Sequence, residues 1–204
     1  MENFNVILLN CSPHKNGCTK RALIEISDTL KKEGVNSEII DVDQNVTGCL
    51  ACGACSKLKK CIKDDQVNIV AEKVRNSDGL IVGAPVYFAS PNGTAISFLD
   101  RLFCSARANF EYKIGASIAS ARRAGTIASF DILNKYFLIS NMIVPGSNYW
   151  NEVHGNTPND VEQDLEGLQT MRVLAKNVAW LIKNLKGKDT PTSEPKIKTN
   201  FIKG

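Results

Sequence analysis

The chain has 204 residues, 43% of them hydrophobic, and this size and composition suit one α/β domain with a real core. Its formal net charge of +4, from 25 basic and 21 acidic residues, is too small to favour a nucleic-acid-binding surface. The amino-terminal segment has only a short apolar run, which argues against a signal peptide or a membrane span. We therefore expect a cytoplasmic protein with no nucleic-acid or membrane partner.

Short apolar runs alternate with segments of helical periodicity along the chain. The expected strands are residues 6–9, 35–42, 79–82, 114–119 and 142–144. One helix is expected from Thr19 to the stop at Gly34, and others at residues 67–74, 92–103, 126–139 and 161–185. This alternation predicts a doubly wound parallel sheet with helices on both faces. We expect one domain over residues 1–187 and a polar tail over residues 188–204.

The loop after the first strand is rich in polar residues, and ligands of doubly wound sheets bind at the carboxyl ends of the strands. It contains Ser12, His14, Asn16, Gly17, Cys18 and Thr19. The free N–H groups and positive dipole end of the helix that follows favour an anion, so the loop predicts a phosphate site. An ordinary capped turn is the alternative. The loop matches neither G-x-x-x-x-G-K-[ST] nor G-x-G-x-x-G, so a phosphate here would belong to a mononucleotide.

Two further loops follow the third and fourth predicted strands. The first places Tyr87 and Phe88 between Pro85 and Pro91, where aromatic rings on a stiff loop suit a flat heterocycle or, alternatively, pack on the domain edge. The second, residues 120–125, offers backbone donors and two arginines that face either a cofactor or solvent.

Four cysteines fall in a C-x2-C-x2-C-x5-C run between the second strand and its helix. They are Cys49, Cys52, Cys55 and Cys61, and the residues between the first three include the small Ala51, Gly53 and Ala54. This spacing favours a 4Fe-4S cluster, because closely spaced thiolates wrap one face of a cluster and small residues let backbone N–H groups approach the sulfide. Redox-active or reduced cysteines and a zinc site are the alternatives. Cys104 lies in a predicted helix, and we expect it to be a buried core thiol.

The stretches LNCSPHKNGCT, GAPVYFASPNG and Phe98-Leu99-Asp100-Arg101 resemble the NADPH-dependent FMN reductase and iron-sulfur flavoprotein group of the flavodoxin superfamily. The resemblance runs from Val6 to about Leu185 and implies a flavodoxin-like five-stranded parallel sheet of order 2-1-3-4-5. The chain departs from the group's usual residues at Cys11, His14, Cys18 and Ile96.

The resemblance also implies a role for each loop. It assigns the FMN phosphate to Ser12, His14, Asn16, Cys18 and Thr19, and the isoalloxazine ring to Pro85, Val86, Tyr87 and Phe88. It places Ser120, Ala121 and Arg122 at the far edge of the ring, and the cysteine run, as an insertion at residues 49–61, on a 4Fe-4S cluster.

We expect an FMN-dependent oxidoreductase that passes electrons between FMN and a 4Fe-4S cluster or an external acceptor, with NAD(P)H as a possible donor. No side chain is needed as a covalent catalyst, because the flavin carries the chemistry. The expected partner is a redox protein or a small acceptor, and a flavin on the rim of a small domain favours a homodimer or homotetramer. The alternatives are a cluster-free NAD(P)H-dependent flavin or quinone reductase, a flavodoxin-type carrier and a cysteine-based sensor without flavin.

Overall fold

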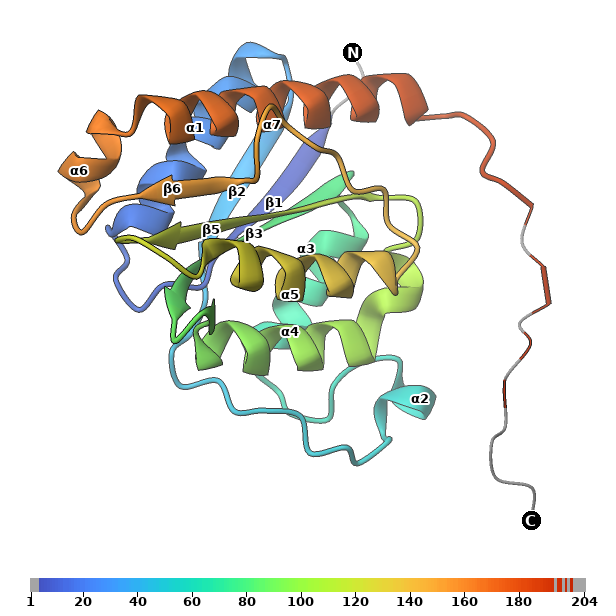
Figure 1. Ribbon diagram of the computed structural model, residues 1–204. Helices are drawn as coiled ribbons and strands as arrows, with labels where there is room; N and C mark the ends of the chain where they lie inside the picture. The colour runs from blue at the N-terminus through green and yellow to red at the C-terminus, as the bar shows by residue number, and fades with distance from the viewer. Residues whose placement is uncertain (1–3, 193, 196, 198, 200–204) are drawn as a thin grey trace.

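The computed structural model describes residues 4–192, 194, 195, 197 and 199 (Figure 1). Its centre is a parallel sheet of order β2-β1-β3-β5-β6. The strands are β1 (Asn5–Asn10), β2 (Asn36–Asp41), β3 (Gly79–Tyr87), β5 (Ile114–Ala121) and β6 (Glu152–His154). A short strand, β4 (Ser90–Pro91), pairs antiparallel with the end of β3. The five parallel strands follow the predicted order 2-1-3-4-5, which is confirmed.

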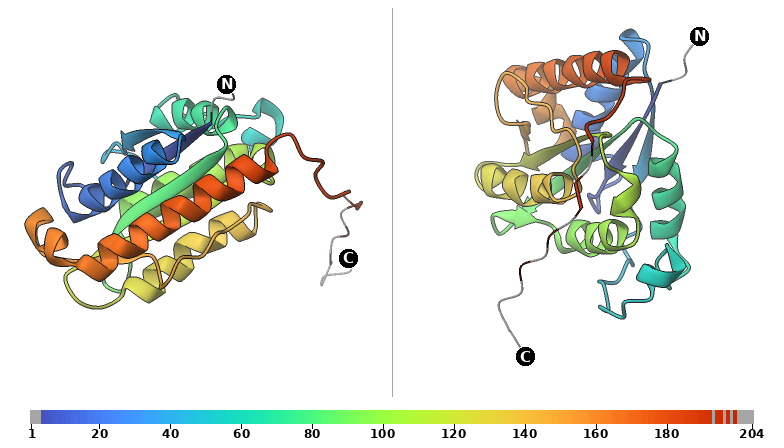
Figure 2. Two further views of the ribbon diagram at one scale, coloured as in Figure 1. Left: turned by 90° about the horizontal axis from the view of Figure 1, so that it is seen from above. Right: turned by 90° about the vertical axis from the view of Figure 1, so that its right-hand side faces the viewer.

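Helices cover both faces of the sheet (Figure 2). One face carries α1 (Cys18–Lys32), α6 (Pro158–Gln163) and α7 (Leu165–Leu185). The other carries α3 (Gln66–Arg75), α4 (Gly93–Ala106) and α5 (Thr126–Leu138). A one-turn helix, α2 (Cys55–Leu58), and a 3-10 turn, η1 (Arg107–Asn109), complete the set. The predicted helices are therefore present, and their placement makes the sheet doubly wound.

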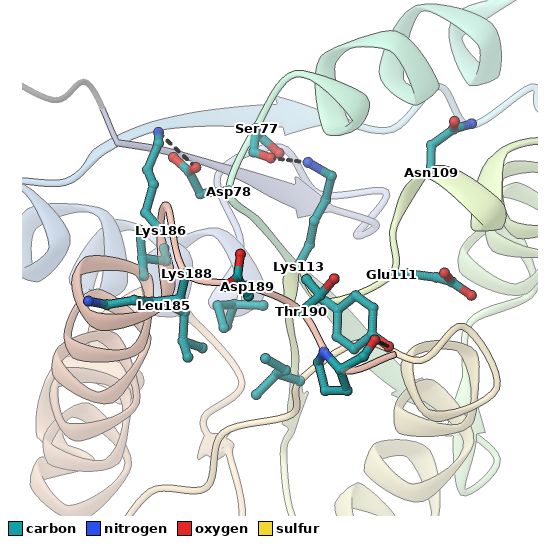
Figure 3. Close-up of a pocket in the computed structure, with 15 residues that line it drawn as sticks. Ser77, Asp78, Asn109, Glu111, Lys113, Leu185, Lys186, Lys188, Asp189 and Thr190 are labelled. Atoms are coloured by element: carbon teal, nitrogen blue, oxygen red, sulfur yellow. Dashed lines mark hydrogen bonds and ion pairs between the residues drawn. The ribbon is translucent and has the colours of Figure 1, made fainter. Parts of the chain in front are cut away.

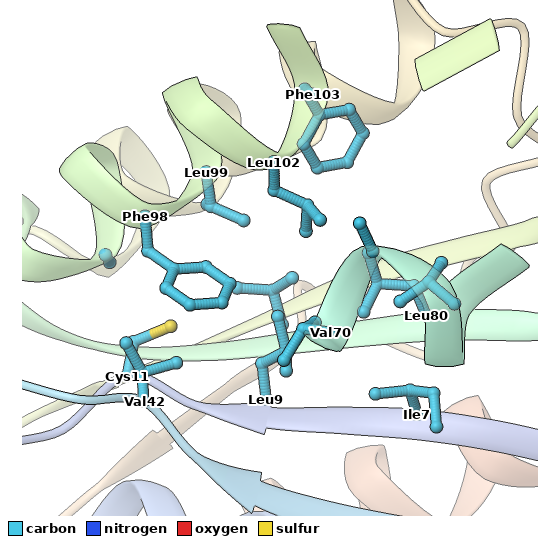
Figure 4. Close-up of a cluster of buried hydrophobic side chains, with 14 of the residues drawn as sticks. Ile7, Leu9, Cys11, Val42, Val70, Leu80, Phe98, Leu99, Leu102 and Phe103 are labelled. Carbon is cyan, nitrogen blue, oxygen red and sulfur yellow. The ribbon is translucent and has the colours of Figure 1, made fainter. Parts of the chain in front are cut away.

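The sheet has one hydrophobic cluster on each face. Along β1, Ile7 and Leu9 point into the cluster with α3, α4 and α5, whereas Val6 and Leu8 point into the cluster with α1 and α7. This alternation follows from the two-residue period of a strand, and burial on both faces explains why the strands read as continuous apolar runs. Figure 4 shows the first cluster, where the side chains of α4 face those of β1.

The fifth strand does not lie where the sequence predicted it. Ile143, in the predicted strand 142–144, makes only an isolated parallel bridge to Ile114, and β6 pairs with β5 instead. Ile143 donates to the carbonyl of Lys113 and accepts from Gly115, so the next donor on this segment would be the N–H of residue 145. Pro145 has no N–H, and the chain therefore leaves the sheet and returns at β6.

The last predicted helix, residues 161–185, is two helices that meet at Asp164. The Asp164 carboxylate accepts hydrogen bonds from the N–H groups of Gly167 (2.9 Å) and His154 (2.7 Å). It therefore caps α7 and ties that helix to β6. A Cβ at position 167 would lie 2.3 Å from the carboxylate, which explains the glycine there.

The chain beyond α7 has no helix or strand among its described residues, and the Tyr112 hydroxyl donates to the carbonyl of Pro191 (3.4 Å). The predicted tail 188–204 lies partly outside the described residues, and the domain boundary at residue 187 stays a prediction. Within the described part of the chain, no helix combines the length and apolar character that crossing a bilayer requires.

Candidate functional site

A cavity of about 450 Å³ opens at the carboxyl ends of β1, β3 and β5. It is lined by Ser12, His14, Asn16, Gly17, Cys18, Thr19, Pro85, Val86, Tyr87, Ser120, Ala121, Arg122 and residues 155–158. We call this cavity the cradle. Every residue predicted to hold the cofactor lines the cradle except Phe88, which is fully exposed at the turn between β3 and β4.

The sequence reasoning missed residues 155–158, because it placed the fifth strand too early in the chain. A local signal was available there. Thr157 accepts a hydrogen bond from the N–H of Asp160, whose carboxylate accepts one from Thr157, and Pro158 starts α6. Such a capping box followed by proline marks a helix start, and the strand before it had to end near Gly155.

The amino end of α1 faces the cradle with its backbone donors open. Gly17 occupies the cap position without a side-chain cap, and the first turn of α1 contains no carboxylate. The preceding turn is closed by hydrogen bonds from the N–H of Gly17 to the His14 carbonyl (3.0 Å) and from the N–H of His14 to the Ser12 hydroxyl (3.1 Å). Open N–H groups at a helix start, with no competing negative charge, suit a phosphate.

A hydroxyl pair and a tight contact fix the floor of the cradle. The hydroxyls of Thr19 and Ser120 are 2.7 Å apart and both residues are buried, so α1 is joined to the end of β5. A Cβ at Gly83 would lie 2.9 Å from the Thr19 methyl group. The glycine therefore lets the start of α1 pack directly on β3.

Asn92 ties the first loop to the start of α4. It occupies the cap position, as predicted, but its side chain makes no cap hydrogen bond to α4. Its amide instead donates to the carbonyl of Cys11 (2.9 Å), and its Oδ1 is buried without a protein partner. The residue thus positions the loop that precedes α1.

The loop after β3 is a two-residue hairpin with an unusual backbone. Phe88 (φ 51°) and Ala89 (φ 57°) are both left-handed, in a turn where glycine or asparagine is normal. Gly125 (φ 92°) packs against this hairpin, since a Cβ there would lie 2.9 Å from Ala89 Cα and 2.9 Å from the Val86 side chain. The contact joins the hairpin to the loop after β5, and those are the two loops predicted to hold the flavin ring.

The cradle fits a flavin mononucleotide. It offers open backbone donors for a phosphate at α1, an exposed arginine at position 122, and a cavity within the usual range of about 300–1,000 Å³ for small-molecule sites. The exposed Tyr87 and the half-buried Val86 supply apolar surface for a flat ring.

A second, smaller cavity of about 30 Å³ brings the cysteine run together. It is lined by Cys49, Leu50, Cys52, Gly53, Cys55, Cys61, Ile62, Lys63, Arg101, Cys104 and Ser105. We call it the cysteine cavity. All four predicted ligands line it, and so does Cys104, which is exposed and not the core thiol that was predicted. Its position on the outer side of α4 explains the difference, because the neighbouring Phe103 takes the core position.

Arg101 holds the cysteine cavity to α4. Its side chain is buried, and its guanidinium binds Asp65 through two nitrogens, at 2.7 and 2.9 Å. Two of its nitrogens also donate to Cys61 Sγ, each at 3.3 Å, and one donates to the carbonyl of Thr47 (3.4 Å). Burial opposes the charge of Asp65, but the hydrogen bonds from Arg101 and from the N–H of Val67 outweigh it and lower the pKa of Asp65.

The chemistry of the donors in this cavity fits an iron-sulfur cluster. Cys49 Sγ accepts from the N–H of Ala51 (3.5 Å), and the left-handed backbone at Ala51 and Gly53 bends the run around the cavity. Hydrogen bonds to sulfur are a recurrent feature of such sites. Over the described ranges of the chain, no three or more His, Cys, Asp or Glu side chains are arranged to hold a single metal ion.

A third cavity, of about 370 Å³, lies at the opposite end of the sheet, where α7 ends (Figure 3). Lys186 is ion-paired to Asp78 (3.0 Å) there, and Lys113 donates to the carbonyl of Ser77. Burial lowers the pKa of Lys113. This cavity sits at the amino ends of the strands, away from the edge where parallel sheets bind ligands.

Comparison with known proteins agrees with this geometry. The sequence profile of the NADPH-dependent FMN reductase family matches residues 4–157. The iron-sulfur flavoprotein MJ1083 of Methanocaldococcus jannaschii is 31% identical over 191 residues, which cover 89% of this chain and 98% of the relative. An iron-sulfur flavoprotein of Methanosarcina thermophila is 31% identical over 172 residues, covering 82% and 89% of the two chains.

Solved structures support the fold. A flavodoxin-like, WrbA-like protein of Agrobacterium tumefaciens superposes with a TM-score of 0.64 at 13% identity, over 90% of this chain and 100% of the other. RosB, solved with a bound 8-demethyl-8-formylriboflavin-5'-phosphate, superposes with a TM-score of 0.70 at 14% identity, over 98% and 94% of the two chains. From the profile match and the relatives, the chain belongs to the NADPH-dependent FMN reductase and iron-sulfur flavoprotein family and is a flavin-dependent oxidoreductase.

Proposed function

We propose that this protein transfers electrons between FMN in the cradle and a 4Fe-4S cluster held by Cys49, Cys52, Cys55 and Cys61. The observation that carries the proposal is that all four cysteines of the run line one cavity against α4. The iron-sulfur flavoproteins among its relatives support it. When bound, FMN supplies two-electron chemistry and can release the electrons one at a time, whereas a cluster takes one.

The protein's own residues bind and orient the cofactors in this proposal. Ser12, Thr19 and the open end of α1 bind the phosphate, and the hairpin after β3 positions the ring. Arg101 holds Cys61 in place through its hydrogen bonds to the sulfur. Both sites stay fixed relative to the core because α4 begins beside the hairpin and carries Arg101 and Cys104 near its other end.

The two sites are separated along α4. From Gly93 to Cys104 the helix advances about 16 Å, at about 1.5 Å per residue. We propose that an electron donor such as NAD(P)H binds at the cradle, and that a redox protein or small acceptor approaches the cysteine cavity. Exposed Lys57, Lys59 and Lys60 beside that cavity would favour an acidic partner, and the free thiols suit a reducing, cytoplasmic location.

We also propose that the protein is a homodimer or homotetramer. Phe88 is fully exposed beside the cradle, and Tyr149 and Trp150 form an exposed edge-to-face pair with ring centres 4.5 Å apart. Exposed aromatic groups of this kind are typical of subunit contacts. Light scattering on the eluted peak of a sizing column measures the assembly, and a monomer at micromolar concentration would contradict the proposal.

Cofactor analysis of anaerobically purified protein tests the proposed function. We expect one FMN and close to four iron and four sulfide per chain, the stoichiometry of a single 4Fe-4S cluster. A Cys52→Ser variant should lose the iron and keep the FMN, because only the cysteine cavity is changed. Full FMN with iron well below one atom per chain after reconstitution would instead indicate a cluster-free NAD(P)H-dependent reductase. Absence of NAD(P)H oxidation with any acceptor would indicate an electron carrier.

A further inference from the structure

The cysteine cavity contains five thiols, one more than the four cysteines of the run. The additional thiol, Cys104, belongs to α4 and not to the segment that carries the other four. A cluster bound by the run needs no ligand from Cys104. Its presence in the cavity therefore calls for another explanation.

Cys104 faces the run across a very small space. Cys49 and Cys104 both line the cavity of about 30 Å³, and within the run Cys49 and then Cys55 act most strongly on the Cys104 thiol. Both Cys49 and Cys104 are exposed, so a small oxidant in solution can reach them. Thiols that share one small cavity and are open to solvent can meet to form a disulfide once the backbone adjusts to its geometry.

The backbone around this pair favours Cys49 over Cys55 and Cys61 as the partner of Cys104. Cys104 is fixed on a helix, between the buried Phe103 and the α4 carboxyl end, whereas Cys49 lies in a segment without helix or strand that can adjust to disulfide geometry. Cys61 is held by two hydrogen bonds from Arg101. Cys55 starts the one-turn helix α2.

We propose that Cys49 and Cys104 form a reversible disulfide when the cysteine cavity holds no cluster, and that this bond protects Cys49 from irreversible oxidation. The protective role rests on the proposed function, since Cys49 is a proposed cluster ligand. The formation of the disulfide does not depend on whether the protein binds a cluster.

Hydrogen peroxide is the oxidant in this reaction. The Cys49 thiolate attacks the peroxide, the O–O bond breaks, and Cys49 becomes a sulfenic acid while one water leaves. The Cys104 sulfur then attacks the Cys49 sulfur, so that an S–S bond forms, the S–O bond breaks and a second water leaves. Two thiols lose two electrons in total and the peroxide gains them. A dithiol such as dithiothreitol returns both electrons and restores the thiols.

Peptide mapping of cluster-free protein tests the disulfide. The protein is stripped with a chelator under anaerobic conditions, treated with one equivalent of hydrogen peroxide, alkylated and digested with trypsin. Cys104 falls in the peptide 102–107, Cys61 in 61–63, and Cys49 in 33–57 together with Cys52 and Cys55. We expect 102–107 linked to 33–57 in the wild type and in Cys52→Ser, and no such link in Cys49→Ser or after dithiothreitol.

The protection of Cys49 from over-oxidation gives a second readout, which is independent of activity. For this readout peroxide is added in excess, because a thiol consumes two peroxides to reach the sulfinic acid and three to reach the sulfonic acid. In Cys104→Ser, Cys49 should then become sulfinic or sulfonic acid, whereas the wild type should return a free Cys49 after dithiothreitol. A link from 102–107 that persists in Cys49→Ser, or that joins 61–63, would overturn the proposed pairing. Equal over-oxidation of Cys49 with and without Cys104 would overturn the protective role.

Cluster-loaded protein separates this proposal from the proposed function. If the protein binds a cluster through Cys49, the same peroxide treatment before chelation should give no linked peptide. A protein that takes up no iron would contradict the proposed function, but the linked peptide would still show whether Cys49 and Cys104 form a disulfide. Bound FMN and far-ultraviolet circular dichroism, measured on each variant, report that the fold is intact.

Discussion

Arg101 carries a full positive charge at a position that water scarcely reaches, with 1% of its surface exposed. Its main neutralising partner, Asp65, is one-third exposed and also caps α3 by accepting from the N–H of Val67 (3.1 Å). Asp65→Asn keeps an amide that can cap the helix but leaves Arg101 without its counter-charge. We expect this variant to lower the free energy of unfolding by about 3 kcal/mol, measured by urea denaturation of reduced, cluster-free protein.

A matched control comes from an exposed ion pair. Glu38 binds Lys73 at 2.7 Å, with 47% and 41% of their side chains exposed. Glu38→Gln makes the same chemical change at a hydrated site, so it should cost less than about 1 kcal/mol. Equal losses in the two variants would mean that Arg101 does not depend on Asp65.

Asn16 tests the phosphate site at the open end of α1. It lines the cradle and is exposed, one residue before the helix cap. Asn16→Asp places a negative charge beside the positive end of the helix dipole, which should stabilise the FMN-free protein by about 0.3–1 kcal/mol. The same charge repels a phosphate, so FMN affinity should fall by about tenfold or more, equivalent to about 1.4 kcal/mol.

Flavin fluorescence titration and thermal unfolding measure these two opposite effects. Asn159→Asp serves as the control, because it adds the same charge to the first turn of α6 at a residue that does not line the cradle. It should leave FMN affinity unchanged. An affinity loss of the same size in both variants would argue against a phosphate at α1.

Single residues of the cradle were easier to predict from the sequence than contacts between side chains that lie far apart in the chain. Ser12 and Thr19 stand out in the sequence because hydroxyls directly after a buried strand, at the start of a helix, have a defined chemistry. Arg101 does not stand out, because it belongs to a helix with ordinary periodicity and its partners Asp65 and Cys61 lie about 40 residues earlier. The exposure of Cys104 was missed for a different reason. Neighbouring positions on a helix point in different directions, so the burial of Phe103 does not extend to Cys104.

At the level of elements, the hairpin after β3 depends on the loop after β5. Gly125 combines a left-handed backbone with close contacts to Val86 and Ala89. Gly125→Ala should therefore strain its own backbone and push the hairpin away from the cradle. We expect FMN to bind at least about tenfold more weakly, since about 1.4 kcal/mol of lost contact is enough for that change.

Gly34→Ala separates backbone strain from the contact. Gly34 is also left-handed (φ 72°), but a Cβ there would meet no atom within 4 Å. The control should lose stability by about 1 kcal/mol and keep its FMN affinity. If both variants bound FMN equally well, the hairpin would not position the flavin.

The elements themselves followed from local patterns, and the errors arose where a single residue interrupts a pattern. Buried strands were identified as short continuous apolar runs, and amphipathic helices by their 3.6-residue period. Pro145 interrupts the fifth strand by removing one donor, and Asp164 splits the last helix by capping its second part. The apolar run at residues 142–144 resembled a strand, and β6 is only three residues long, so periodicity alone could not rank the two.

At the level of the whole molecule, the hydrophobic cluster on the α3, α4 and α5 face of the sheet contains a fully buried, ionisable thiol. Cys11 lies in the cluster between the sheet and α4, and Figure 4 shows its sulfur beside the ring of Phe98. Burial raises the pKa of Cys11 from 9.0 to about 12. The unfolded chain releases this proton near pH 9 and the folded protein does not.

This difference predicts how stability changes at alkaline pH. A raised folded pKa contributes stability fully below the unfolded value, and the contribution is lost as the pH rises toward the folded value. Between about pH 9 and 11 the free energy of unfolding should therefore fall by up to about 1.4 kcal/mol per pH unit from Cys11. Cys11→Ala should be less stable at pH 7, because it leaves a cavity, but its alkaline slope should be shallower by that amount. Cys104→Ser, at an exposed thiol, should change the slope much less. Urea denaturation of reduced protein between pH 7 and 11 measures the slopes, and an unchanged slope in Cys11→Ala would contradict a buried, protonated Cys11.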